Sequence, residues 1–126
     1  MELSASLQDY LEGILFVQQE KGRARVADLA GFLNVKKPSV VKSLLKLKEL
    51  GLIEQEPYQA IQLTSSGRAL ALKISKRHNV LKDFFFQVLM IDEKTADRDA
   101  CRIEHVISSK TFERLTQFVE KHKKAS

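Results

Sequence analysis

Residues 23–64, RARVADLAGFLNVKKPSVVKSLLKLKELGLIEQEPYQAIQLT, decide the fold. The first part predicts a short helix over residues 26–33 with a left-handed stop at Asn34. A longer helix follows, because Pro38 suits the first helical turn and Gly51 suits a helix end. Two helices joined by so short a turn are typical of a helix-turn-helix.

The rest of this stretch predicts a β-hairpin. Residues 52–56 and 60–64 are short extended runs, and Pro57-Tyr58-Gln59 between them is typical of a hairpin tip. A hairpin directly after a helix-turn-helix is the element order of a winged helix-turn-helix.

Helical patterns continue on both sides of this segment. We expect a mainly α fold with a small β-hairpin: a winged helix-turn-helix over residues 1–71, followed by a second, helical domain over residues 72–126. The further helices are predicted from Ser4 or Ser6 to about Lys21, from Ser65 to Leu89, from Glu93 to Ile107, and from Ser108 or Ser109 onward.

Composition narrows the function classes. The 126 residues are 44% hydrophobic and 29% charged, which is typical of a soluble globular protein. No apolar run approaches the roughly 20 residues of a membrane helix, and no secretion signal is visible at the N-terminus. Cys101 is the single cysteine, so no internal disulfide can form and the expected location is the reducing cytoplasm.

Positive charge is concentrated in the middle of the chain. The net charge is +5, and residues 36–77 carry nine basic and three acidic side chains, a net +6. Such a segment favours a polyanionic partner, nucleic acid before membrane.

The helix after Pro38 is the expected groove reader. Its apolar stripe is predicted to be Val41, Leu44, Leu45 and Leu47, with lysine and serine side chains on the opposite face. Base-reading Arg, Asn and Gln are scarce there, so the helix predicts affinity better than specificity. The alternative is an ordinary solvated face. The candidate DNA contacts are Arg25, Lys36, Lys37, Ser39, Lys42, Ser43, Lys46 and Tyr58.

A second constellation suggests a metal site. Cys101, Glu104 and His105 have the spacing that would place them on one side of a helix. Thiolate, carboxylate and imidazole all bind first-row divalent metals. Ordinary structural roles are the alternative: Cys101 as a core thiol, Asp9 and Glu12 as solvated acids near a helix N-terminus, and His78 as a half-buried histidine. The full candidate set is Asp9, Glu12, His78, Cys101, Glu104 and His105.

Six segments together resemble the diphtheria-toxin-repressor family of metal-dependent transcriptional repressors, which includes the manganese transport regulators. They are Asp9-Tyr-Leu-Glu12-Gly-Ile, Arg23-Ala-Arg-Val-Ala-Asp-Leu-Ala, Pro38-Ser-Val-Val, Leu63-Thr-Ser-Ser-Gly, Arg77-His78 and Ala100-Cys-Arg-Ile-Glu-His-Val. The resemblance implies a winged helix-turn-helix, a helical domain that forms a homodimer, and Mn2+ or Fe2+ as corepressor, one or two ions per subunit.

The resemblance also implies a hybrid ligand set. The family has manganese-type and iron-type members. Asp9, Glu12 and His78 stand at positions that are metal ligands in the manganese-type members, and Glu104 and His105 stand at positions that are ligands in both types. Cys101 matches the iron-type members. Lys82 and Asp97 stand at two ligand positions of the iron-type second site, so that version of the site is not expected. The resemblance is to a short form without an SH3-like third domain.

Three functions follow as hypotheses. The first is a metal-dependent repressor of metal-ion homeostasis genes that binds a double-stranded DNA operator. The second is a winged-helix regulator of a non-metal or thiol-redox signal. The third is a small metal-binding protein or enzyme, which the lack of a nucleophile–base pair disfavours. The expected protein is therefore not an enzyme, and it has no organic small-molecule substrate and no membrane partner.

Overall fold

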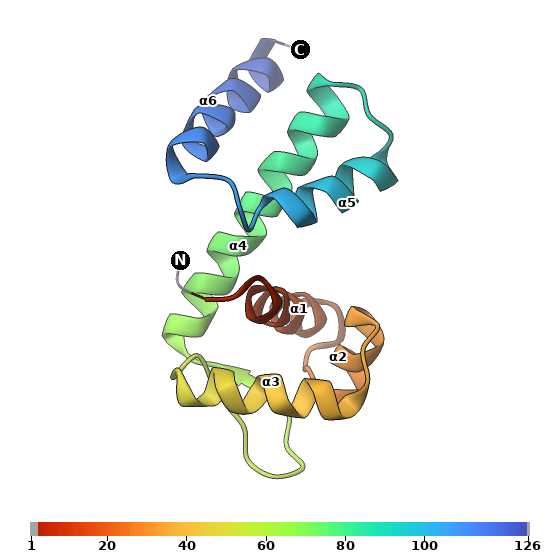
Figure 1. The fold of residues 1–126 in the computed structure, drawn as a ribbon, viewed down its shortest axis with the longest axis vertical. Helices are drawn as coiled ribbons and strands as arrows, with labels where there is room; N and C mark the ends of the chain where they lie inside the picture. The colour runs from red at the N-terminus through yellow and green to blue at the C-terminus, as the bar shows by residue number, and fades with distance from the viewer. Residues whose placement is uncertain (1–2, 126) are drawn as a thin grey trace. The chain divides into compact units, whose positions relative to one another are not determined.

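The computed structural model describes residues 3–125, so residues 1, 2 and 126 of the two predicted domains lie outside the described part. The chain divides into two compact units between Lys73 and Ile74. Six α-helices, one π-helical turn and a two-stranded antiparallel sheet make up the described residues, which confirms the predicted mainly α fold with a small hairpin (Figure 1). None of the helices in residues 3–125 is both long and apolar enough to cross a membrane.

The first unit is the winged helix-turn-helix. Figure 1 shows α2 and α3 joined by a short turn, with the hairpin leaving the end of α3. Its elements are α1 (Ala5–Lys21), α2 (Val26–Leu33), α3 (Lys37–Glu49), β1 (Ile53–Glu54), β2 (Gln62–Leu63) and the start of α4 (Ser65–Asp83).

Short-range capping sets the helix ends, as the sequence predicts. Ser4 caps α1, since its hydroxyl accepts a hydrogen bond from the Leu7 amide at 3.2 Å. Gly22 ends α1 in the left-handed region with φ 82°. Asn34 ends α2 with φ 56° and ψ 49°.

The hairpin forms the wing. Ile53 pairs with Leu63, and Glu54 pairs with Gln62, so the paired part is shorter than the two predicted extended runs. An isolated bridge between Ala24 and Ile61 joins the segment before α2 to the base of the wing. The wing is therefore anchored on two sides, which fixes where its tip projects.

The core of the first unit corrects one prediction. The buried face of α3 is Val40, Leu44 and Leu47, which follow the i, i+4, i+7 spacing. Val41 and Leu45 were expected in that stripe but are 48% and 59% exposed. They lie roughly 100° around the helix from Val40 and Leu44, one residue past the buried row.

The second unit contains the rest of α4 and three further elements. They are the π-helical turn η1 (Phe84–Val88), α5 (Glu93–Ile103) and α6 (Ser109–Ala125). The turn η1 packs against both α5 and α6. Asp92 caps α5 through the Thr95 amide, and Ser108 accepts a hydrogen bond from the Thr111 amide at the start of α6.

Two predicted helix ends differ from the structure. The helix expected over residues 65–89 is α-helical only to Asp83 and then widens into η1. The helix expected over residues 93–107 ends at Ile103, with Glu104 as its C-cap. Glu104 and His105 thus lie in a turn after α5 rather than on one side of a continuing helix.

Candidate metal centre and nucleic-acid interface

The candidate DNA contacts lie on the first unit: at α3, at the turn before it, at the wing and, for Arg25, at the N-cap of α2. Lys36 is the N-cap residue of α3, so its charge lies at the start of the expected groove reader. Lys42 and Ser39 are exposed on α3, whereas Ser43 is half-buried. Lys46 is exposed, and its Nζ lies 3.9 Å from Oε2 of Glu49, which makes a weak surface ion pair. The lysine face is therefore solvent-accessible, as DNA contact requires.

Arg25 and Tyr58 come together although 33 positions separate them. Nη1 of Arg25 donates a hydrogen bond to the Tyr58 carbonyl oxygen at 3.4 Å. Tyr58 is 96% exposed and has a positive φ of 62°, so its side chain projects from the wing tip. A guanidinium and a phenol at the tip of a wing can contact phosphate or sugar.

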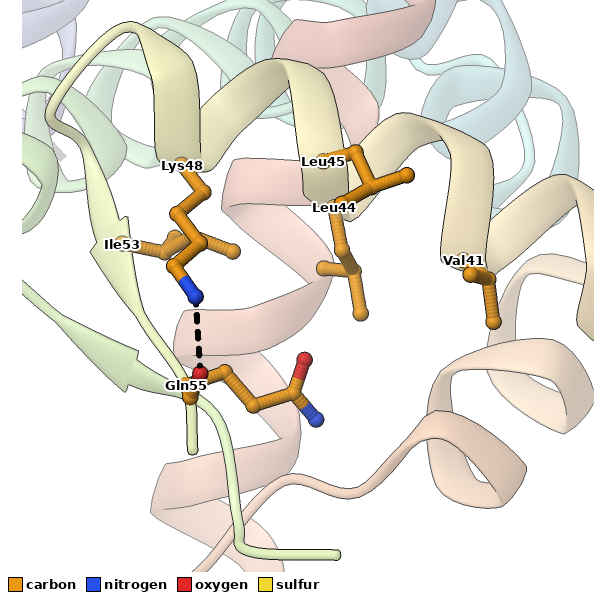
Figure 2. A pocket seen from close by; sticks show the side chains of 6 residues that line it. All are labelled: Val41, Leu44, Leu45, Lys48, Ile53 and Gln55. Carbon is orange, nitrogen blue, oxygen red and sulfur yellow. Dashed lines mark hydrogen bonds between the residues drawn. The ribbon is translucent and has the colours of Figure 1, made fainter. Parts of the chain in front are cut away.

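Lys48 has a role that sequence reasoning missed. Its Nζ donates a hydrogen bond to the main-chain carbonyl oxygen of Gln55 at 3.1 Å, which ties α3 to the wing. Figure 2 shows this bond across a hollow that Val41, Leu45 and Ile53 also line. Because the partner is a backbone atom of another element, no local pattern signals the contact.

Three of the candidate metal ligands meet in the second unit. Glu104 lies between two histidines: its Oε2 is 3.5 Å from Nδ1 of His78, and its Oε1 is 3.5 Å from Nε2 of His105. His78 comes from α4, while Glu104 and His105 come from the turn after α5. Two imidazoles and one carboxylate thus come together in this part of the second unit.

Glu104 is the strongest sign of a ligand. Its side chain is 1% exposed, and neither carboxylate oxygen accepts a hydrogen bond from the described residues. A buried carboxylate without hydrogen bonds is costly and rare in native proteins. A divalent cation between carboxylate oxygen and imidazole nitrogen would offset that cost, so these residues fit such an ion.

Two residues outside the candidate set make contacts at or near these ligands. Oδ1 of Asp97 is 2.9 Å from Nε2 of His78, and Arg77 donates a 2.7 Å hydrogen bond to the Ile107 carbonyl oxygen. These partners are 19 and 30 positions apart, so sequence spacing could not reveal them.

The remaining candidates come from α5 and α1. Cys101 is half-buried in the last turn of α5, close in sequence to Glu104. Asp9 and Glu12 are half-buried and one turn apart on α1, in the first unit. Their spacing places both carboxylates on the same side of α1.

Comparison with protein families accounts for both units. Residues 2–61 match the family described as the iron dependent repressor, N-terminal DNA binding domain. Residues 64–125 match the iron dependent repressor, metal binding and dimerisation domain. The two matches together cover nearly the whole chain.

Individual relatives agree with these matches. An uncharacterized HTH-type transcriptional regulator of Methanocaldococcus jannaschii is 41% identical over 122 residues, which are 96% of this chain and 98% of that protein. The transcriptional regulator MntR of Escherichia coli O157:H7 is 37% identical over 116 residues, 92% of this chain and 74% of that protein.

Solved structures share the fold. A manganese-dependent transcriptional repressor in complex with manganese superposes with a TM-score of 0.83 at 29% identity, over 90% of this chain and 52% of that chain. IdeR of T. acidophilum gives a TM-score of 0.78 at 28% identity, over 87% of this chain and 52% of that chain. This chain thus spans about half the length of these two solved chains.

Proposed function

Because this chain belongs to the iron-dependent-repressor family of metal-dependent transcriptional regulators, we propose that it represses transcription as a homodimer with Mn2+ or Fe2+ as corepressor. The observation that carries the proposal is the buried carboxylate of Glu104 between His78 and His105. We place this activity in the cytoplasm, on genes of metal-ion homeostasis, without an enzymatic step, an organic small-molecule substrate or a membrane partner.

Residues 1–71 form the DNA-binding domain in this proposal. The exposed lysines of α3 neutralise phosphates of a double-stranded operator, while the hydroxyl of Ser39 reaches base edges or the backbone. Arg25 and Tyr58 contact the backbone beside the wing. The support is that the candidate contacts Lys36, Lys37, Ser39, Lys42 and Lys46 are all exposed.

Residues 72–126 form the metal-binding and dimerisation domain. His78, Glu104 and His105 supply imidazole and carboxylate ligands, and Asp9 and Glu12 of α1 complete the set with two carboxylates. Cys101 adds a thiolate. When bound, the divalent cation supplies the positive charge that offsets three acidic side chains.

The regulatory step follows from where these ligands stand in the chain. If Asp9, Glu12 and Glu104 came together without a cation, their three negative charges would repel one another. A cation bound by Asp9 and Glu12 together with Glu104 would link α1 to the turn after α5. In a dimer this sets the separation of the two α3 helices, which has to match successive major grooves ~34 Å apart. DNA then binds the metal-loaded arrangement with higher affinity.

A titration tests the function. Duplex DNA selected by the Mn2+-loaded protein from a random pool is titrated in the presence of Mn2+, Fe2+ or a chelator. We expect chelation to abolish specific binding and either metal to restore it. Unchanged affinity after chelation would refute the metal-dependent repressor. If a thiol oxidant instead of a chelator changed the affinity, the signal would be redox and Cys101 would be the sensor.

A further inference from the structure

Asp97 contacts a candidate metal ligand although it is not itself in the ligand set. Its Oδ1 lies 2.9 Å from Nε2 of His78. A carboxylate accepts hydrogen bonds and cannot donate them, so the hydrogen of this contact belongs to His78. The side chain of His78 is 16% exposed, so the contact lies at the edge of the protein interior.

This contact decides which nitrogen of His78 can bind a cation. A neutral imidazole carries one N–H and one lone pair, and the hydrogen bond at one nitrogen sets the role of the other. With Nε2 carrying the hydrogen, Nδ1 presents the lone pair. Nδ1 is the atom 3.5 Å from Oε2 of Glu104. Two acceptor atoms at this separation repel each other unless a cation lies between or beside them.

Lys82 contacts the same carboxylate oxygen of Asp97. Its Nζ is 3.7 Å from Oδ1 of Asp97 and 3.3 Å from Oε1 of Glu93. His78 and Lys82 are four residues apart on α4, so both side chains reach α5 from the same helix face. Because Asp97 and Glu93 are 55% and 69% exposed, these ion pairs contribute little to stability. Their effect is to fix the orientation of the Asp97 carboxylate.

We propose that Asp97 is a positioning residue for the metal ligand His78: it fixes the Nε2–H tautomer and so leaves Nδ1 to bind the divalent cation, while Lys82 orients Asp97. The inference rests on the proposed function, since it assigns a residue to the same metal site. Partners of this kind orient ligating histidines in many metal sites, and their loss lowers metal affinity roughly 10- to 100-fold.

Two measurements on the full chain test this role. The first is the tautomer of His78, read from its ring ¹⁵N chemical shifts without metal, at a pH at which the ring is neutral. We expect the Nε2–H form in the native protein and a mixture of both tautomers in Asp97→Ala. The second is the affinity for Mn2+ alone, which we expect to fall about 10- to 100-fold in Asp97→Ala.

Matched variants separate positioning from folding. Asp97→Asn keeps the shape and a carbonyl acceptor, so we expect it to retain the Nε2–H tautomer and most of the affinity. Glu93→Gln alters the other partner of Lys82, so we expect its Mn2+ affinity to stay within about twofold of the native value. Each variant is checked by thermal unfolding before titration.

The outcomes distinguish this inference from the proposed function. If Asp97→Ala and Asp97→Asn both keep the native tautomer and the native Mn2+ affinity while His78→Ala loses affinity, the positioning role is wrong and the metal site stands. If His78→Ala itself binds Mn2+ as tightly as the native chain, the proposed metal site is wrong at this residue and the inference fails with it.

Discussion

Arg77 donates a 2.7 Å hydrogen bond from Nη2 to the main-chain carbonyl oxygen of Ile107. Its guanidinium also lies over the ring of Phe112, 5.2 Å from the centroid. Arg77 precedes His78 on α4, and Ile107 lies two residues after His105. The bond therefore links the helix that carries one candidate ligand to the turn that carries two others.

Replacing Arg77 with Met should loosen this turn. Met keeps the apolar stem of the side chain but removes the donor, so the free energy of unfolding should fall by about 1.5–3 kcal/mol. Mn2+ affinity should fall as well, because Glu104 and His105 lose their restraint. Urea unfolding and Mn2+ titration measure the two effects. Arg102→Met, at an exposed position of α5, should change stability by less than about 0.5 kcal/mol, and equal effects of both variants would contradict the linking role.

The Glu104→Gln variant should lose the response to metal without losing the fold. The native protein should melt at a higher temperature with Mn2+, since a ligand at 100 times its Kd adds about 2.7 kcal/mol of stability. The variant should show no such rise. Its metal-free form should be at least as stable as the native one, because an uncompensated buried charge is gone. Thermal unfolding with and without Mn2+ decides, and an equal rise in both proteins would exclude Glu104 as a ligand.

Lys42→Ala should weaken binding to all DNA sequences alike. Removing one phosphate contact should reduce the slope of log affinity against log salt by about one unit. Fluorescence anisotropy over a salt series, with specific and random duplexes, measures the slope. Lys110→Ala, which removes an exposed lysine from α6, is the control and should leave the slope unchanged. No change in Lys42→Ala would mean that this face of α3 does not contact phosphates.

Gly67 is required for close packing at the start of α4. A Cβ at this position would lie 1.9 Å from the Leu52 carbonyl oxygen, which already accepts a hydrogen bond from the Thr64 amide. Gly67→Ala should therefore destabilise the protein by about 3 kcal/mol or more. Gly31→Ala is the matched control, because a Cβ there meets nothing within 4 Å and should stabilise α2 by about 0.5–1 kcal/mol. Urea unfolding of both variants should give opposite signs, and a neutral Gly67→Ala would contradict the close approach.

Asp28 should make stability depend on pH at acidic values. Hydrogen bonds from the Lys21 ammonium and from the Arg25 amide lower the pKa of its carboxyl below the usual 3.8. A lowered pKa adds stability at pH values above the pKa of the unfolded state. This stability is lost as the pH falls through the pKa of the folded state. Asp28→Asn should therefore be less stable than the native protein near neutral pH, and the difference should shrink below about pH 4. Urea unfolding from pH 7 to pH 2.5 tests this, and a constant difference would refute the charge effect.

Much of the fold can be predicted from the sequence because its signals are local. Ser4, Asn34 and Asp92 act on backbone groups within a few residues of themselves, so the ends that they set were predicted correctly. The order of helices and hairpin follows from such ends. The wing tip at Tyr58 was predicted for the same reason.

The predictions from sequence were wrong where contacts with other elements decide which side chain is buried or how a helix continues. Val40 and Val41 are identical side chains on one helix, and the packing of α3 against α1, α2 and β1 decides that Val40 rather than Val41 is buried. The π-helical turn after Asp83 follows a run of three phenylalanines that fits an α-helix equally well by spacing alone. There, packing of the turn against α5 and α6 accompanies the wider backbone.

For the candidate site too, some features follow from local sequence and others only from contacts between elements. Residue types and short spacings alone identified His78, Glu104 and His105 as ligands to consider, because donor chemistry is a property of each side chain. Only the tertiary structure showed that Glu104 is buried between the two histidines. The same holds for the contact of Asp97 with His78 and for the hydrogen bond from Arg77 to Ile107. Burial and contact between positions 19 to 30 residues apart depend on how the helices pack, and local spacing does not determine that packing.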